Sequence, residues 1–472
     1  MSDSHSGLDL SFRDPAVRPQ DDLFGHVNGA WLDEHEIPAD RALDGSFRAL
    51  YDQAEKDVRV IIDDAVEAAR SGDAAADSDI RKIGDLYRSF MDTRRVAAAG
   101  LAPLAREAAT IHEAADHTEL AVALAGLQAA GVRGTVGLFV DTDAKDSSRY
   151  LLHLNQSGLG LPDESYYRED AHAETREKYA AHVGRMFALA GFVPEGDAAA
   201  AGQRVLDLET AIAAAHWDRV RNRDADLTYN VSSPARLAEE NPGFPWQRWL
   251  GAVLGATGAE TDGGEPGGAP DELIIRQPSF LTGMAELWSS RPLEDWRTWA
   301  LWQLLHSRAG FLTDDVVEEN FDFYGRTLTG AEELRDRWKR GVSLVEELMG
   351  EAVGKLYVER HFPPDAKARM QILVDDLLEA YRRNISELEW MTPETRRRAL
   401  AKLETFTPKI GYPERWKDYS AVQVTADDLM ANVRSGNLAE SRRELEKLGG
   451  PVDRTEWFMT PQTVNAYYNP GM

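Results

Sequence analysis

Histidine is the first candidate for chemistry in this chain, because eleven histidines are present and there is no cysteine to supply a thiolate. The strongest zinc signal is His-Glu-x-x-His, which places two imidazoles one helical turn apart with a general-base glutamate between them. The sequence does not contain it. His112 and His117 come nearest, but a spacing of five residues puts them roughly 140° apart around a helix. His35 also fails, since Pro38 breaks the helix that the motif needs. We therefore expect no metal ligands in this chain.

Other catalytic signatures are also missing from the sequence. It has no Gly-x-Gly-x-x-Gly, no phosphate-binding loop and no Gly-x-Ser-x-Gly elbow. Residues 157–160 (Ser-Gly-Leu-Gly) are glycine-rich, but they lack the lysine and the helix start that a phosphate cradle requires. The 80 acidic residues are too numerous for any one carboxylate pair to indicate a glycosidase.

Tryptophan offers one further binding surface. Six of the twelve tryptophans lie close together in the sequence, and they could line a groove for a sugar or a peptide: Trp246, Trp249, Trp288, Trp296, Trp299 and Trp302. At helical spacings such residues more often belong to a core, so we expect a core.

Composition places the chain among soluble globular proteins, with 43% hydrophobic and 28% charged residues. The net charge of −27 argues against a nucleic-acid partner, because binding phosphates needs clustered Lys and Arg, and it disfavours an anionic membrane surface. Residues 1–9 lack the basic and apolar regions of a signal peptide. No apolar stretch is long enough to span a bilayer. We therefore expect a cytoplasmic protein.

The chain must position any functional residues mainly with helices. Apolar residues at three- and four-residue spacings predict helices over 47–62, 79–92, 104–130 and 173–215. Three more apolar stripes, over 334–356, 370–388 and 399–406, predict further helices, with Pro363-Pro364 between the first two.

The predicted β structure is small. Residues 135–141 and 150–155 read as the strands of a hairpin joined by the turn residues 143–148. Residues 256–270 have linker composition and indicate a flexible insertion, and residues 1–20 read as a flexible arm. The fold class is therefore mainly α, a large multi-helix lobe with a small β-hairpin element.

The C-terminal segment is unusual. Val464–Tyr468 is a short β-prone run that Asn469-Pro470-Gly471 ends as a turn. Such a run is expected to pair with and pack against other elements, but only four residues follow it. We therefore expect the C-terminus to be poorly folded, which hydrogen exchange at Ala466–Tyr468 would test.

A series of segments between about Asp21 and Met472 matches a known family in that family's order: 22–32 with 37–38 and 45–47, 83–92, 157–163 with 166–167, 320–324, 337–340, 409–413 and 464–470. Through these segments the chain resembles the neprilysin and endothelin-converting-enzyme family of zinc metallopeptidases, in its bacterial oligopeptidase branch. One such match would be weak, but the ordered series is specific.

The resemblance implies a two-lobed zinc endopeptidase acting on oligopeptides. Residues 21–450 look like the helical lobe, which restricts substrate access, and residues 451–472 like the start of a thermolysin-like α+β catalytic lobe, of which 464–468 would be the first strand. In the family, the zinc helix, the third zinc ligand and the oxyanion-stabilising histidine follow that strand. The chain thus resembles a truncated enzyme that lacks its zinc site and is inactive alone.

Two candidate site residues carry over from the family. Its Asn-Ala-Tyr-Tyr motif holds the substrate main chain through the Asn side chain and the Ala backbone, and it matches Asn465 and Ala466 here. In the alternative interpretation, Asn465 satisfies only local backbone groups. Family arginines near a Gly-x-Phe segment do not transfer, because the spacing in Arg41–Arg48 does not match.

Two functions remain open. The first is the N-terminal region of a zinc-dependent metalloendopeptidase, whose partner would be the missing catalytic lobe. The second is a non-catalytic module that binds peptides or a partner chain through an exposed strand at 464–468.

Overall fold

The computed structural model describes residues 10–258 and 270–472, and the chain is mainly helical with one small sheet. The sheet order is β1-β2-β4-β3. Its strands are β1 (Val136–Asp143), β2 (Asp146–Gln156), β3 (Val231–Ser232) and β4 (Leu273–Ile275). β1 and β2 are antiparallel, with Val136 opposite Gln156, and β4 runs parallel to β2. The predicted hairpin is confirmed, although its strands extend further into the turn than the sequence indicated.

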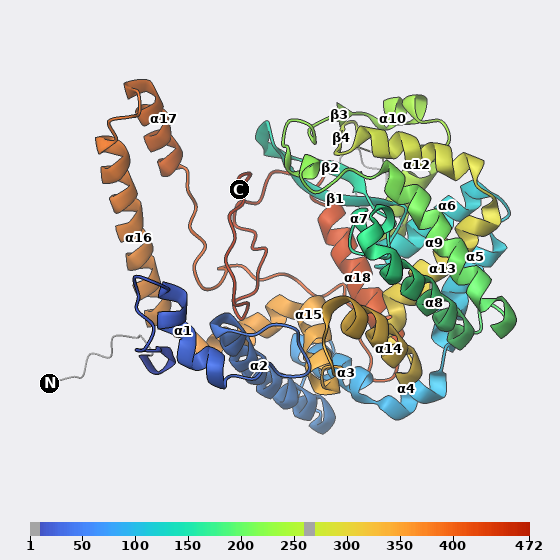
Figure 1. The fold of residues 1–472 in the computed structure, drawn as a ribbon, viewed down its shortest axis with the longest axis horizontal. Helices are drawn as coiled ribbons and strands as arrows, with labels where there is room; N and C mark the ends of the chain where they lie inside the picture. The colour runs from blue at the N-terminus through green and yellow to red at the C-terminus, as the bar shows by residue number, and fades with distance from the viewer. Residues whose placement is uncertain (1–9, 259–269) are drawn as a thin grey trace.

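The largest group of helices packs around this sheet (Figure 1). It comprises α5 (Ala105–Glu113), α6 (His117–Ala129), α7 (Ser165–Arg168), α8 (Ala173–Ala190), α9 (Ala198–Ala215), α10 (Pro234–Glu240), α11 (Trp246–Thr257), α12 (Pro278–Ser290), α13 (Leu293–Arg308) and α14 (Asp314–Phe321). The six neighbouring tryptophans are each at most 1% exposed. The prediction that they belong to the core is confirmed.

A second apolar core joins helices that are distant in sequence. These helices are α2 (Ser46–Ser71), α3 (Asp79–Met91), α15 (Arg337–His361) and α18 (Leu429–Leu445). The short helix α4 (Thr93–Ala99) follows α3. At Gly84 a side chain would overlap the backbone carbonyl of Ala65, so glycine permits α2 and α3 to approach closely.

Two helices project from the body as an arm (Figure 1). α16 (Pro364–Glu387) begins just after α15, as the two prolines predicted, and α17 (Pro393–Glu404) folds back along it. Neither helix has a buried residue. The apolar stripe of α16 is present but uncovered, since Leu373, Leu377 and Tyr381 are 52%, 51% and 58% exposed. Helix α1 (Leu23–Glu34) also has no buried residue.

The C-terminal segment runs between this arm and the sheet (Figure 1). Its predicted strand at 464–468 does not form: the prediction was wrong because a strand requires a pairing partner, and no described strand pairs with these residues. The predicted insertion at 256–270 lies mostly outside the described residues. So do residues 1–9 of the flexible N-terminal segment that was predicted at 1–20. No described helix has the length and apolar character needed to cross a membrane. The proposed division between 21–450 and 451–472 stays a prediction.

Candidate substrate-binding segment and a separate cavity

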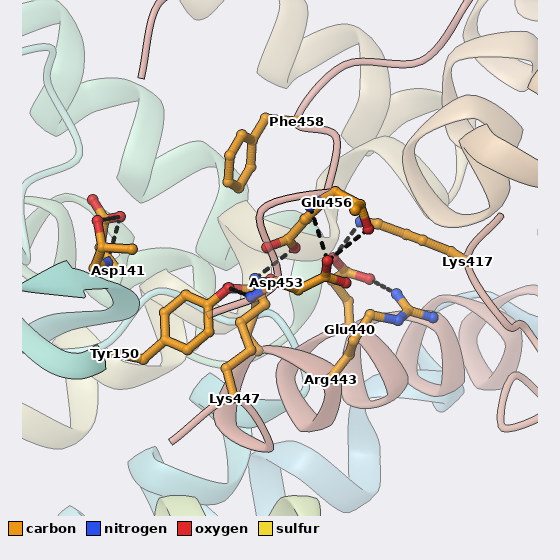
Figure 2. Close-up of polar contacts among 12 residues, drawn as sticks. Asp141, Tyr150, Lys417, Glu440, Arg443, Lys447, Asp453, Glu456 and Phe458 are labelled. Atoms are coloured by element: carbon orange, nitrogen blue, oxygen red, sulfur yellow. Dashed lines mark hydrogen bonds and ion pairs between the residues drawn. The ribbon is translucent and has the colours of Figure 1, made fainter. Parts of the chain in front are cut away.

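The C-terminal segment 451–472, called the tail below, carries Asn465 and Ala466. A cluster of charged side chains attaches it to the body (Figure 2). Lys447, two residues after the end of α18, places its Nζ 2.6 Å from Glu444 and 2.7 Å from Glu456 of the tail. Burial opposes the charge of Lys447, but the two carboxylates outweigh it and raise the pKa of the ammonium. The Tyr150 hydroxyl of β2 accepts a hydrogen bond from the Asp453 N–H at 3.1 Å. The tail is therefore tied to the turn that follows α18 and to the sheet.

A second set of ion pairs surrounds this cluster. Glu440 accepts from Lys417 at 3.2 Å and from Arg443, while Arg415 pairs with Asp453. A cavity of about 460 Å³ lies among these side chains. The charged groups around this cavity are therefore largely paired with one another.

Further along, the tail packs directly on α15. Gln462 donates to the Gly350 carbonyl at 3.1 Å. A Cβ on Gly354 would lie 2.7 Å from Pro461, so small residues on α15 let the tail approach. Lys409 donates to the Glu456 carbonyl from the other side. These contacts position the residues that follow.

Asn465 and Ala466 lie side by side in an exposed stretch. The Asn465 Oδ1 accepts a hydrogen bond from the Ala466 N–H at 2.8 Å, which is the local contact that the alternative interpretation describes. The flanking tyrosines hold the stretch: the Tyr467 hydroxyl accepts from the Phe458 N–H, and the Tyr468 ring stacks on Phe406. Both candidate residues are thus presented to solvent from an anchored backbone.

A different site follows β2, at the glycine-rich loop 157–163. Side chains from four separate segments donate to four successive loop carbonyls: His216 to Ser157, Trp299 to Gly158, Arg133 to Leu159 and Tyr324 to Gly160. Tyr324 belongs to a π-helical turn at Asp322–Thr327, a rare geometry that is frequent at functional sites. The loop forms one wall of a cavity of about 650 Å³.

Behind this loop lies a buried carboxyl. Glu209 of α9 is fully buried and accepts from the Tyr167 hydroxyl at 2.6 Å, the Tyr179 hydroxyl at 2.9 Å and the Gly160 N–H at 3.2 Å. Burial raises the pKa of the Glu209 carboxyl to about 7, against the opposing effect of the two tyrosine hydrogen bonds. Sequence reasoning missed this network. Its signal is that Glu209 lies four residues after Val205 and three before Ile212, on an apolar stripe.

The described residues do not fit a zinc site. Across 10–258 and 270–472, no group of three or more His, Asp or Glu side chains could hold a metal ion. His117 instead donates to the Arg291 carbonyl at 3.0 Å, and His35 lies 2.9 Å from Asp44.

Comparisons with known proteins agree with this architecture. Residues 19–413 match the family model described as Peptidase family M13. The chain is 24% identical to neprilysin of Mus musculus, over 97% of this chain and 64% of that protein. It is also 24% identical to endothelin-converting enzyme 1 of Homo sapiens, over 98% of this chain and 60% of that protein.

Solved structures are similar as well. The zinc metalloprotease ZMP1 of Mycobacterium tuberculosis, in complex with an inhibitor, has 57% identity and a TM-score of 0.92, over 99% of this chain and 68% of that chain. PEPO of Lactobacillus rhamnosis, at 23% identity, shares the fold with a TM-score of 0.83. The chain spans less than two thirds of the length of the neprilysin and endothelin-converting enzymes named above. On the extent of the family match, this chain belongs to peptidase family M13.

Proposed function

We propose that this chain forms the helical, access-restricting lobe of a zinc-dependent metalloendopeptidase that cleaves oligopeptides. The zinc-binding lobe would come from residues outside this chain. Family membership and the 57% identity to a zinc metalloprotease support the proposal. Because the described residues hold no group suited to a metal ion, we propose that the chain alone is inactive.

The observation that carries this proposal is the uncovered apolar surface of the arm and α1. Leu373, Leu377 and Tyr381 expose one face of α16, and Leu23 and Phe24 of α1 are exposed too. Monomeric soluble proteins rarely leave large apolar patches in water, and such patches mark contact surfaces. A catalytic lobe packed against these helices would cover them.

Asn465 and Ala466 would hold the substrate within that assembly. An extended peptide beside the tail would receive main-chain hydrogen bonds from the Ala466 backbone and the Asn465 amide, in the manner of an added strand. The present bond from the Ala466 N–H to Asn465 Oδ1 would then be exchanged for bonds to the peptide. Both residues are exposed, as this role requires.

The test compares the chain alone with a completed enzyme. Hydrolysis of an internally quenched oligopeptide in the presence of zinc should be undetectable for the 472-residue chain, and bound zinc should be absent by mass spectrometry. Adding the C-terminal part of the M. tuberculosis enzyme, as a fusion or a separate chain, should give activity. Stoichiometric zinc and peptidase activity in the chain alone would contradict the inactivity.

A second candidate is a non-catalytic module that recruits a peptide or a partner chain. The exposed backbone at 464–468 favours it, since unpaired main-chain groups can template another strand. The two functions separate in the same experiment: a fusion that binds zinc but cleaves nothing would favour the module. A cytoplasmic location is proposed for either function.

A further inference from the structure

The cavity beside loop 157–163 is lined by one acidic and one basic side chain, Glu164 and Arg133, that form no ion pair with any described residue. Glu164 is only 7% exposed, lines the cavity, and forms no hydrogen bond or ion pair through its side chain with any described residue. Its carboxylate oxygens are not sealed from solvent, because they face the cavity. They are therefore accessible to a cationic group of a ligand.

Arg133 provides the opposite charge on the same cavity. It donates one hydrogen bond to the Leu159 carbonyl and forms no ion pair with any carboxylate in the described part of the chain. Arg133 and Glu164 do not pair with each other, although both line the cavity. Arg219 and Asp163, which also line it, lie 3.6 Å apart and neutralise one another. Among the described residues that face this space, the exposed Arg133 and the buried Glu164 therefore have no ion-pair partner, although the charge of Arg133 also opposes the rise in the pKa of Glu209.

The remaining polar groups of the cavity add no charge. Burial lowers the pKa of His306 to about 3 and that of His216 to about 4, so both rings are neutral near pH 7. The loop carbonyls are already engaged by side-chain donors. The walls are thus fixed in place before a ligand arrives, which reduces the cost of ordering them.

We propose that this cavity binds a short peptide with free termini, whose ammonium group pairs with Glu164 and whose carboxylate pairs with Arg133. The volume of about 650 Å³ is within the range of small-ligand sites and far exceeds that needed for one ion. The choice of a peptide rests on the proposed function, because hydrolysis of oligopeptides releases short zwitterionic products. Neither Asn465 nor Ala466 lines this cavity, and the ligand that we assign to it is a released product.

The contrast with the 460 Å³ cavity under the tail supports this assignment. There, lysine and arginine side chains pair with neighbouring carboxylates across the space. In the larger cavity the two charges stay apart. A structural ion pair would have brought them together, whereas a zwitterionic ligand requires them to be separated.

The test is isothermal titration calorimetry of the 472-residue chain with dialanine. N-acetyl-dialanine lacks the ammonium group and dialanine amide lacks the carboxylate, so each should bind roughly tenfold or more weakly than dialanine. Free alanine tests whether a single amino acid is long enough to bind. All of these ligands are titrated into the unaltered chain, so the series needs no variant. No binding of dialanine at millimolar concentration, or equal binding of the blocked peptides, would overturn the proposal.

Variants then assign the charges. Glu164→Gln should weaken dialanine binding by roughly tenfold or more and leave N-acetyl-dialanine binding unchanged. Arg133→Gln should weaken dialanine but not dialanine amide. The controls Glu169→Gln and Arg94→Gln remove exposed charges outside the cavity and should change nothing. Thermal unfolding verifies that each variant is folded.

The outcome is independent of peptidase activity. A chain that binds dialanine through Glu164 but yields no peptidase on fusion would retain this inference and lose the proposed function. If the fusion is an active peptidase but the chain does not bind dialanine, the proposed function is retained and this inference is overturned. Unchanged dialanine affinity in a folded Glu164→Gln variant would refute the role of Glu164.

Discussion

Replacing Glu209 by Gln should change how the stability of the chain depends on pH. Burial raises the pKa of Glu209 from an ordinary 4.5 to about 7. The folded state therefore holds this proton more tightly than the unfolded state does. The stabilisation is fully present below pH 4.5, falls as pH rises toward 7 and is lost above 7.

The magnitude follows from that interval. At 1.36 kcal/mol per pKa unit, a rise from 4.5 to about 7 corresponds to about 3 kcal/mol. Glutamine keeps an oxygen for the Tyr167 and Tyr179 hydroxyls and carries no charge to bury. Glu209→Gln should therefore gain about 3 kcal/mol relative to the unaltered chain between pH 5 and pH 8.5.

The assay is urea unfolding followed by tryptophan fluorescence at several pH values. The matched control is Glu239→Gln, which removes an exposed carboxylate on α10 and should give a difference independent of pH. A Glu209→Gln difference that is flat from pH 5 to pH 8.5 would refute the argument, because it would mean that Glu209 titrates alike in both states.

Three further predictions concern packing and charge. Gly160→Ala should destabilise the chain by about 2 kcal/mol in urea unfolding, because the added methyl group overlaps the buried Tyr179 hydroxyl, whereas Gly251→Ala on α11 meets nothing and should be neutral or stabilising. Lys447→Met should lower the free energy of unfolding by about 2 kcal/mol, because it leaves Glu444 and Glu456 without their shared cation. Lys402→Met, at an exposed lysine, is the control. Equal losses of stability in the two variants would contradict the role of the cluster. Leu373→Glu should change the unfolding free energy by less than about 0.5 kcal/mol while reducing self-association in light scattering, and a large loss of stability would show that α16 is covered.

Local patterns predicted most of the elements. The apolar spacing over 47–62 lies within α2, and alternation with turn residues located β1 and β2. The six tryptophans were assigned to the core because their spacings are helical, and they are buried. These features depend on neighbours along the chain, which the sequence displays directly.

Features that depend on distant partners were not predictable. The amphipathic pattern of 370–388 indicates a helix with an apolar face, but it cannot say whether another element covers that face. The β-prone run 464–468 forms no strand because pairing is decided by other segments. Glu164 and Arg133 are 31 positions apart, and only the fold places them on one cavity.

The arm formed by α16 and α17 leaves and rejoins the body at one place. The Phe362 ring lies edge-on to the Tyr412 ring, with centroids 5.6 Å apart, and Lys367 donates to the Tyr412 carbonyl at 2.9 Å. Since the arm has no buried residue, its unfolding would not open either core. The entry and exit points of the arm are therefore adjacent. We expect substitutions in the arm to change the stability of the body little.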